Sequence, residues 1–181
     1  MKVNHRQRLR WIVPLVLFMM TIIDAALPAI FPRAFLGSGQ VIISHLTLYF
    51  IVLFAFYFRD SNILLWSVIA GLFHDSYNTT FLGLYATLYF LISYIVLKTR
   101  QFFPKSPLVF YMLFIVLVTL LDFVVFIFYT EILDYASLSV LHFLVNRLGP
   151  TLIFTTVMCI LLYLPSRNLL RWLGYESYII F

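Results

Sequence analysis

The sequence carries little charge and almost no cysteine. Only 10% of its 181 residues are charged, whereas 64% are hydrophobic. This composition excludes an ordinary water-soluble globular protein, because too few polar side chains are available to cover its surface. The single cysteine, Cys159, lies inside the last apolar run, which excludes an internal disulfide and a metal cluster held by cysteines. The chain is therefore expected to lie in a lipid bilayer.

Motifs that mark common catalytic and nucleotide-binding sites are also missing. The sequence contains no glycine-rich phosphate loop, no HExxH and no GxSxG, and Cys159 has no histidine beside it. His45 lies in an apolar run and is typical of a hydrogen-bonded packing residue. We therefore expect a protein without enzymatic activity, cofactor or bound metal.

The apolar runs predict six transmembrane helices in a single membrane domain, residues 1–181. A helix needs about 20 apolar residues to cross the hydrocarbon core, so about six spans leave no room for a soluble domain. The predicted spans cover residues 11–31, 40–58, 62–75, 81–97, 108–129 and 138–164. Proline and glycine mark the breaks between spans, at Pro32 with the turn 37–39, at Pro104 and Pro107, and at Pro165.

The basic residues predict the orientation of these helices. With the N-terminus in the cytoplasm, ten of the twelve Lys and Arg residues are cytoplasmic, against Arg33 outside and Arg147 within the last span. The ten are Lys2, Arg6, Arg8, Arg10, Arg59, Lys98, Arg100, Lys105, Arg167 and Arg171. Both termini are then cytoplasmic, and the first helix is expected to be an uncleaved span instead of a signal peptide.

Two flanking segments complete this topology. Residues 1–10 form a basic cytoplasmic tail, and residues 166–181 have the pattern of a helix lying in the cytoplasmic headgroup layer, although docking on a cytoplasmic partner stays open. The basic residues flank apolar runs and form no continuous patch. Nucleic acid is therefore not expected as a partner, despite the net charge of +5.

Four ionisable residues lie inside the predicted spans. Asp24, Asp75, Asp122 and Arg147 come from four different spans, yet counting along each helix places all four in the outer half of the bilayer. A charge at the bilayer centre costs about 2.5 to 3.5 kcal/mol on insertion scales, and one guanidinium can bind two carboxylates through its forked donors. We therefore predict that the three aspartates converge on Arg147.

This predicted polar cluster has two interpretations. In the first, ion pairs lock the helices in register and no ligand binds, which is favoured because the opposite charges nearly compensate. In the second, the cluster is a proton or ion relay, or it lines an outward cavity that binds a small solute. Asn146, beside Arg147, and His74, beside Asp75, would complete the network in either case.

Small residues in the third predicted span indicate close helix packing. Ser67, Gly71 and Asp75 recur every four residues and therefore share one helix face, which allows a neighbouring backbone to approach. The polar turn at 76–80 is predicted to lie below the outer headgroups. Non-helical backbone at that depth has to be covered by protein or line a wet cavity.

The stretch GLFHDSYNTTFLGLYATLYFLISYIVLK, residues 71–98, resembles the signature region of the rod shape-determining protein MreD family. In that family a Gly, three residues, an Asp, a small polar turn and a second Gly recur. LLDF at 120–123 and NRLGPT at 146–151 resemble two further family features, an acidic residue in the fifth span and an Arg followed by Pro. The matching positions in this chain are Gly71, Asp75, Gly83, Asp122, Arg147 and Pro150.

The resemblance implies an all-α integral membrane protein of the bacterial cytoplasmic membrane, with a fold similar to the substrate-binding subunits of energy-coupling-factor transporters. It implies a scaffold without catalytic residues, which binds MreC and works with MreB, RodA and a class B penicillin-binding protein in lateral wall synthesis. Two other functions stay open at this stage. One is a solute-binding membrane subunit of a vitamin-type transporter, and the other is a lipid-handling enzyme.

Overall fold

Helices form the secondary structure of the protein in the computed structural model, which describes residues 5–37, 39–58, 61–78, 81–132 and 139–174 and contains no strand among them. The long helices are α1 (His5–Ile30), α3 (Leu46–Tyr57), α4 (Ile63–Asn78), α5 (Leu84–Thr99), α6 (Pro107–Ile127) and α8 (Gly149–Trp172). The short elements are α2 (Pro32–Phe35), α7 (Val140–Phe143), the 3-10 turn η1 (Arg100–Phe102) and the π-helical turns η2 (Phe128–Ile132) and η3 (Leu144–Leu148).

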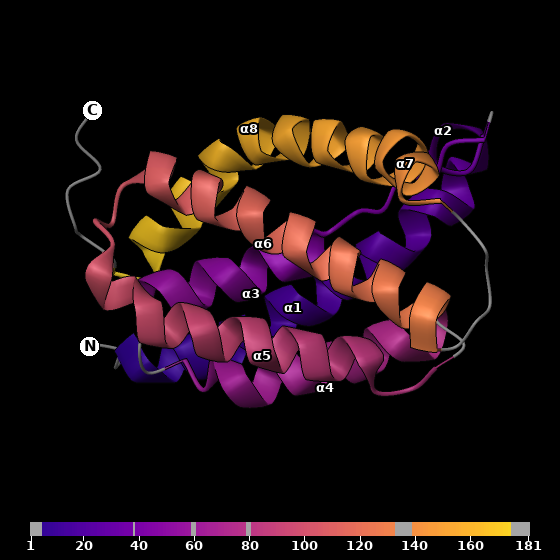
Figure 1. Ribbon diagram of the computed structural model, residues 1–181. Coiled ribbons are helices and arrows are strands. Elements are labelled where there is room, and N and C mark those ends of the chain that lie inside the picture. The colour runs from indigo at the N-terminus through magenta and orange to yellow at the C-terminus, as the bar shows by residue number, and fades with distance from the viewer. Residues whose placement is uncertain (1–4, 38, 59–60, 79–80, 133–138, 175–181) are drawn as a thin grey trace.

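Successive long helices run in alternating directions along one bundle (Figure 1). The start of α1 and the end of α8 therefore lie at the same end of the bundle, which we call the terminal end. Within the described part of the chain, three segments are long and apolar enough to cross a membrane, Leu9–Ile30, Pro107–Glu131 and Val140–Trp172, and two shorter apolar helices accompany them. The all-helical membrane architecture is thus confirmed, while six crossings and cytoplasmic termini stay predictions.

The second predicted span starts later than the sequence indicated. Residues 41–45 are not helical, and α3 begins only at Leu46. The backbone N–H of Val41 donates to the carbonyl of Asn146 at 2.8 Å, and that of Ile42 donates to the carbonyl of Phe35 at 2.8 Å. The prediction of a helix from residue 40 was wrong because these distant carbonyls satisfy the backbone in place of a helical turn.

The predicted break of the last helix at Pro165 was also wrong. α8 continues through Pro165 to Trp172, so residues 166–172 extend that helix and do not form a separate segment. Proline is tolerated inside membrane helices when neighbouring groups satisfy the backbone that it frees. Residues 175–181 of the predicted interfacial segment lie outside the described residues.

Helix α3 is the centre of the bundle. All 12 of its residues are buried, which is the pattern of a helix enclosed by others. Tyr49 packs edge-on against Phe110 and Phe114 of α6, with ring centroids 5.4 and 5.2 Å away, and its hydroxyl hydrogen-bonds Ser166 of α8 at 3.0 Å. At about 1.5 Å per residue α3 is about 18 Å long, shorter than the roughly 30 Å of hydrocarbon. At least one of its ends therefore lies inside the apolar layer.

Helices α4 and α5 form a closely packed hairpin. A Cβ added to Gly71 would lie 2.4 Å from the Cα of Ala86, so only glycine fits there without a shift of backbone. Farther along the same interface, the hydroxyls of Ser67 and Ser93 lie 3.0 Å apart. The close approach predicted from Ser67 and Gly71 is confirmed.

This packing generates a first prediction. Gly71→Ala should lower the free energy of unfolding by about 1 to 3 kcal/mol, the usual cost of overpacking a tight interface. The measurement is unfolding in mixed dodecyl maltoside and SDS micelles. The matched control is Ser76→Ala, an exposed position on the same helix, which should change stability by less than about 0.5 kcal/mol. Equal stability of the two variants would contradict the role given to Gly71.

Candidate functional site

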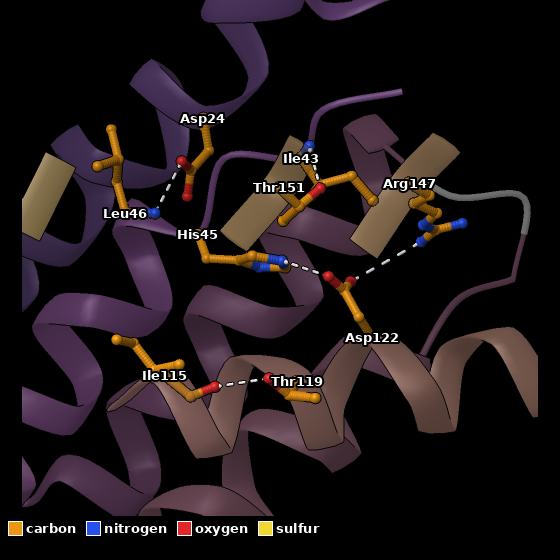
Figure 2. Close-up of polar contacts among 9 residues, drawn as sticks. All are labelled: Asp24, Ile43, His45, Leu46, Ile115, Thr119, Asp122, Arg147 and Thr151. Carbon is orange, nitrogen blue, oxygen red and sulfur yellow. Dashed lines mark hydrogen bonds and ion pairs between the residues drawn. The ribbon is translucent and has the colours of Figure 1, made fainter. Parts of the chain in front are cut away.

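Asp24, in α1, caps the N-terminus of α3. Its carboxylate accepts a hydrogen bond from the backbone N–H of Leu46 at 3.0 Å (Figure 2). It also accepts hydrogen bonds from the backbone N–H of Thr47 at 2.8 Å and from the Thr47 hydroxyl at 2.6 Å. A carboxylate in this position satisfies the unpaired N–H groups of the first turn and complements the positive end of the helix dipole. These bonds compensate for burial of Asp24, which is 4% exposed.

Asp75, near the end of α4, does the same for α5. Its carboxylate accepts hydrogen bonds from the backbone N–H groups of Gly83 at 2.9 Å, Tyr85 at 3.0 Å and Ala86 at 3.2 Å. The N-cap position is Gly83, whose φ of 105° suits glycine and which has no side chain to act as a cap. Asp75 therefore supplies from the neighbouring helix the acceptor that α5 lacks.

Asp122, in α6, is the aspartate that meets Arg147. One carboxylate oxygen lies 3.3 Å from Nε2 of His45 and the other 4.0 Å from a terminal nitrogen of the Arg147 guanidinium (Figure 2). Asp122 is fully buried, while the Arg147 side chain is 28% exposed and also lies over the Phe143 ring, 6.0 Å from its centroid. These two contacts link His45, directly before α3, and Arg147, in the turn η3, to Asp122 of α6.

The predicted convergence of the three aspartates on Arg147 has to be corrected. Among the described residues, Asp122 is the one aspartate within ion-pairing distance of Arg147. Asp24 and Asp75 are bound by backbone N–H groups of helix starts instead. A helix that begins inside the bundle presents several unpaired donors to a nearby carboxylate, and a single distant guanidinium does not displace them.

Asn146 has another role than the sequence suggested, and Pro150 was singled out only as a position that matches the family. The Asn146 amide contacts the ring of His142, at 2.9 Å from Nδ1, and its main-chain carbonyl holds Val41. Pro150 lies in the first turn of α8, directly after the π-helical turn η3, where its missing N–H costs no regular helical bond. Neither residue belongs to an aspartate network.

A cavity of about 500 Å³ lies at the end of the bundle opposite to the terminal end. Its volume is in the range of small-molecule sites. The polar side chains that line it are those of Asp24, Ser44, His74, Tyr77, Tyr85, Tyr129 and Arg147. It reaches the surface, because Tyr77 is 75% exposed. An outward polar cavity was one of the two interpretations of the sequence, and we call this hollow the polar cavity.

The hydrogen-bond partners of Asp24 and Asp75 could not be predicted from the sequence. The N–H groups at the starts of α3 and α5 belong to residues such as Leu46 and Tyr85, which carry no polar signal of their own. Thr151 was also missed, although its hydroxyl accepts a hydrogen bond from the N–H of Ile43 at 3.2 Å (Figure 2). The one available signal was Gly83, a turn glycine directly before a helix without a local cap.

The cap of α5 generates a second prediction. Asp75→Ala should lower the free energy of unfolding by about 2 kcal/mol or more, since a cap contributes about 0.5 to 2 and each buried donor left unsatisfied costs about 1 to 3. Asp75→Asn, which keeps an acceptor, should fall between Asp75→Ala and the natural protein. The control is the exposed carboxylate Glu131, and equal losses for Asp75→Ala and Glu131→Ala would rule out the capping role.

A third prediction tests whether Asp75, Asp122 and Arg147 form one polar cluster or two independent sets of interactions. In a double-mutant cycle, Asp122→Ala and Arg147→Ala should show a coupling energy of about 0.5 to 3 kcal/mol, because each removes the partner of the other. Asp75→Ala and Arg147→Ala should be additive within about 0.5 kcal/mol. Both cycles are measured by unfolding in mixed micelles. Strong coupling between Asp75 and Arg147 would restore the single cluster.

Comparison with known proteins gives one match. A family model described as rod shape-determining protein MreD matches residues 5–173, which include the α4–α5 hairpin, Asp122 and the stretch from Arg147 to Pro150. Searches of curated proteins and of solved structures find no match. The matching family has a membrane role in rod shape determination and is not a known enzyme family. With most of its length covered by that family model, the chain belongs to the MreD family.

Proposed function

We propose that this protein is a non-enzymatic scaffold of the bacterial elongation machinery. It binds the membrane span of MreC and helps couple cytoplasmic MreB filaments to RodA and a class B penicillin-binding protein during peptidoglycan synthesis. Its place is the bacterial cytoplasmic membrane. These partners follow from the family and go beyond what the family match itself states.

The observation that carries the proposal is the use of the three buried aspartates. Asp24 and Asp75 each accept three hydrogen bonds from another helix, and Asp122 contacts His45 and Arg147. A general base needs a free lone pair directed at a substrate proton, whereas both oxygens of Asp24 and Asp75 accept hydrogen bonds from protein donors and one oxygen of Asp122 faces His45. Their arrangement supports a role in fixing helices against one another.

The outer surface of the bundle supports contact with other membrane helices. Large apolar side chains are exposed along α1, α6 and α8, for example Leu15 at 62%, Met112 at 64% and Ile160 at 72%. Such a surface faces lipid where it is free and packs against a partner span where one is bound. MreC, with its single span, is a partner that this surface suits.

The second candidate is a solute-binding membrane subunit of a vitamin-type transporter. The polar cavity favours it, because a hollow of about 500 Å³ with aromatic and charged side chains has the size of a site for a small solute. The similarity in fold to energy-coupling-factor subunits, which the resemblance to the MreD family implies, stays a prediction.

Site-specific photo-crosslinking in cells tests the proposal. A photoreactive amino acid at Leu15, Met112 or Ile160 should crosslink to MreC from at least one of these helices, whereas one at the buried Val118 should not. Affinity purification from membranes should also recover MreC and RodA. Recovery of a tightly bound vitamin with an ATPase-linked subunit, and no crosslink to MreC, would decide for the transporter.

A further inference from the structure

An apolar groove runs along the outside of the bundle between α1 and α4. It consists of two hollows of about 360 and 210 Å³ that share the side chains of Phe18, Thr21 and Phe73. Small residues line it on both helices, among them Ala26 and Ala70. From Pro14 to Ala26 the groove extends about 18 Å along α1, which slightly exceeds half of the roughly 30 Å of hydrocarbon. This is the depth that one lipid chain occupies.

The polar cavity has unused capacity for hydrogen bonds to an anion. The Asp24 carboxylate that lines it is already occupied by the first turn of α3. Arg147 has a long contact to Asp122, at 4.0 Å, and within the described residues its Nε has no hydrogen-bond partner. His74 is 4% exposed, and its Nδ1 has no partner among these residues either. A guanidinium with free donors in a buried polar site favours phosphate or carboxylate.

The groove and the polar cavity meet at Tyr77, which lines both and is 75% exposed. Just before it on α4, Phe73 lines the groove and its neighbour His74 lines the cavity. Consecutive residues of one helix therefore face an apolar and a polar compartment. A molecule that fills both has a charged head and an apolar chain.

We propose that the polar cavity and the groove form one binding site for an anionic membrane lipid. The phosphate of the headgroup binds at Arg147 and His74, and a hydrocarbon chain lies in the groove between α1 and α4. This goes beyond the scaffold role and does not depend on it.

Two other occupants explain less of the geometry. A soluble phosphate would use Arg147 but leave the adjoining groove without a role. A partner helix, about 10 Å wide with its side chains, would cover the groove but bring no acceptor to Arg147 and His74. A lipid accounts for both the apolar groove and the donors of Arg147 and His74.

Lipid binding to the purified full chain in dodecyl maltoside tests the proposal, with native mass spectrometry and thermal unfolding as readouts. The probes are dioleoyl phosphatidic acid, dioleoyl phosphatidylcholine and inorganic phosphate. Phosphatidic acid should bind saturably at one site per chain, at least about tenfold more tightly than phosphatidylcholine. Its phosphomonoester is more negative and less hindered, whereas the phosphate of phosphatidylcholine is a diester whose charge is balanced by the attached choline. Inorganic phosphate should bind more weakly than phosphatidic acid, since it gains nothing from the groove.

Two pairs of variants locate the site. Arg147→Gln removes the cation and Ala26→Phe fills the groove, and each should weaken phosphatidic acid binding by about tenfold or more. Their controls are Arg33→Gln, an exposed cation in α2, and Ala29→Phe, an exposed position on α1, which should leave binding unchanged. If Arg147→Gln fails to fold because Asp122 loses its partner, Ala26→Phe, which alters no polar contact, decides alone.

Four results would overturn the proposal. Equal affinity for phosphatidic acid and phosphatidylcholine, or no effect of Ala26→Phe, would show that lipids bind without this site. Inorganic phosphate binding as tightly as phosphatidic acid would identify a soluble anion site. Displacement of phosphatidic acid by the MreC span would assign the groove to protein. Loss of the MreC crosslink with lipid binding intact would count against the scaffold role alone.

Discussion

A helix that starts inside an apolar layer needs hydrogen-bond acceptors for its first N–H groups. The structure of this protein depends on that requirement. Where hydrocarbon or packed side chains surround such a start, each unsatisfied donor costs several kcal/mol. The protein meets the requirement twice in the same way, with Asp24 of α1 at the start of α3 and Asp75 of α4 at the start of α5. In both cases the carboxylate comes from the helix that packs alongside, so the cap also sets the depth of one helix against the other.

This requirement also explains why a polar hollow exists in the bundle. Because α3 begins only at Leu46, the chain before it runs without helical hydrogen bonds, held by Phe35, Asn146 and Thr151. That segment is thinner than a helix and leaves room beside α1, α4 and α6. Side chains of these helices line the hollow, together with Arg147 of the turn η3, whose carboxylate partner Asp122 lies 4.0 Å away.

The sequence predicted the class of fold and the residues that matter, but not all of their partners. Hydropathy and breaks predicted the helical membrane architecture, and the spacing of small residues predicted the contact at Gly71. Counting along helices predicted that Asp24, Asp75 and Asp122 converge on Arg147, and among the described residues the contact between Asp122 and Arg147 is the part of this prediction that the structure contains. It did not reveal that backbone donors bind Asp24 and Asp75, because a main-chain N–H has no signature in the sequence. The helix was predicted to end at Pro165 for a related reason. Whether a helix continues through a proline depends on neighbouring groups in the tertiary structure, which the sequence does not show.

Full enclosure of α3 has a consequence for how the protein responds to its bilayer. A change in hydrocarbon thickness acts on lipid-facing segments, which tilt to match it at a modest cost per ångström. None of the 12 residues of α3 offers such a surface, and its depth is fixed by side chains at both ends, Asp24 at one and Arg100 on the carbonyl of Ala55 at the other. The outer helices can therefore adapt to membranes of different thickness while the central helix keeps its place.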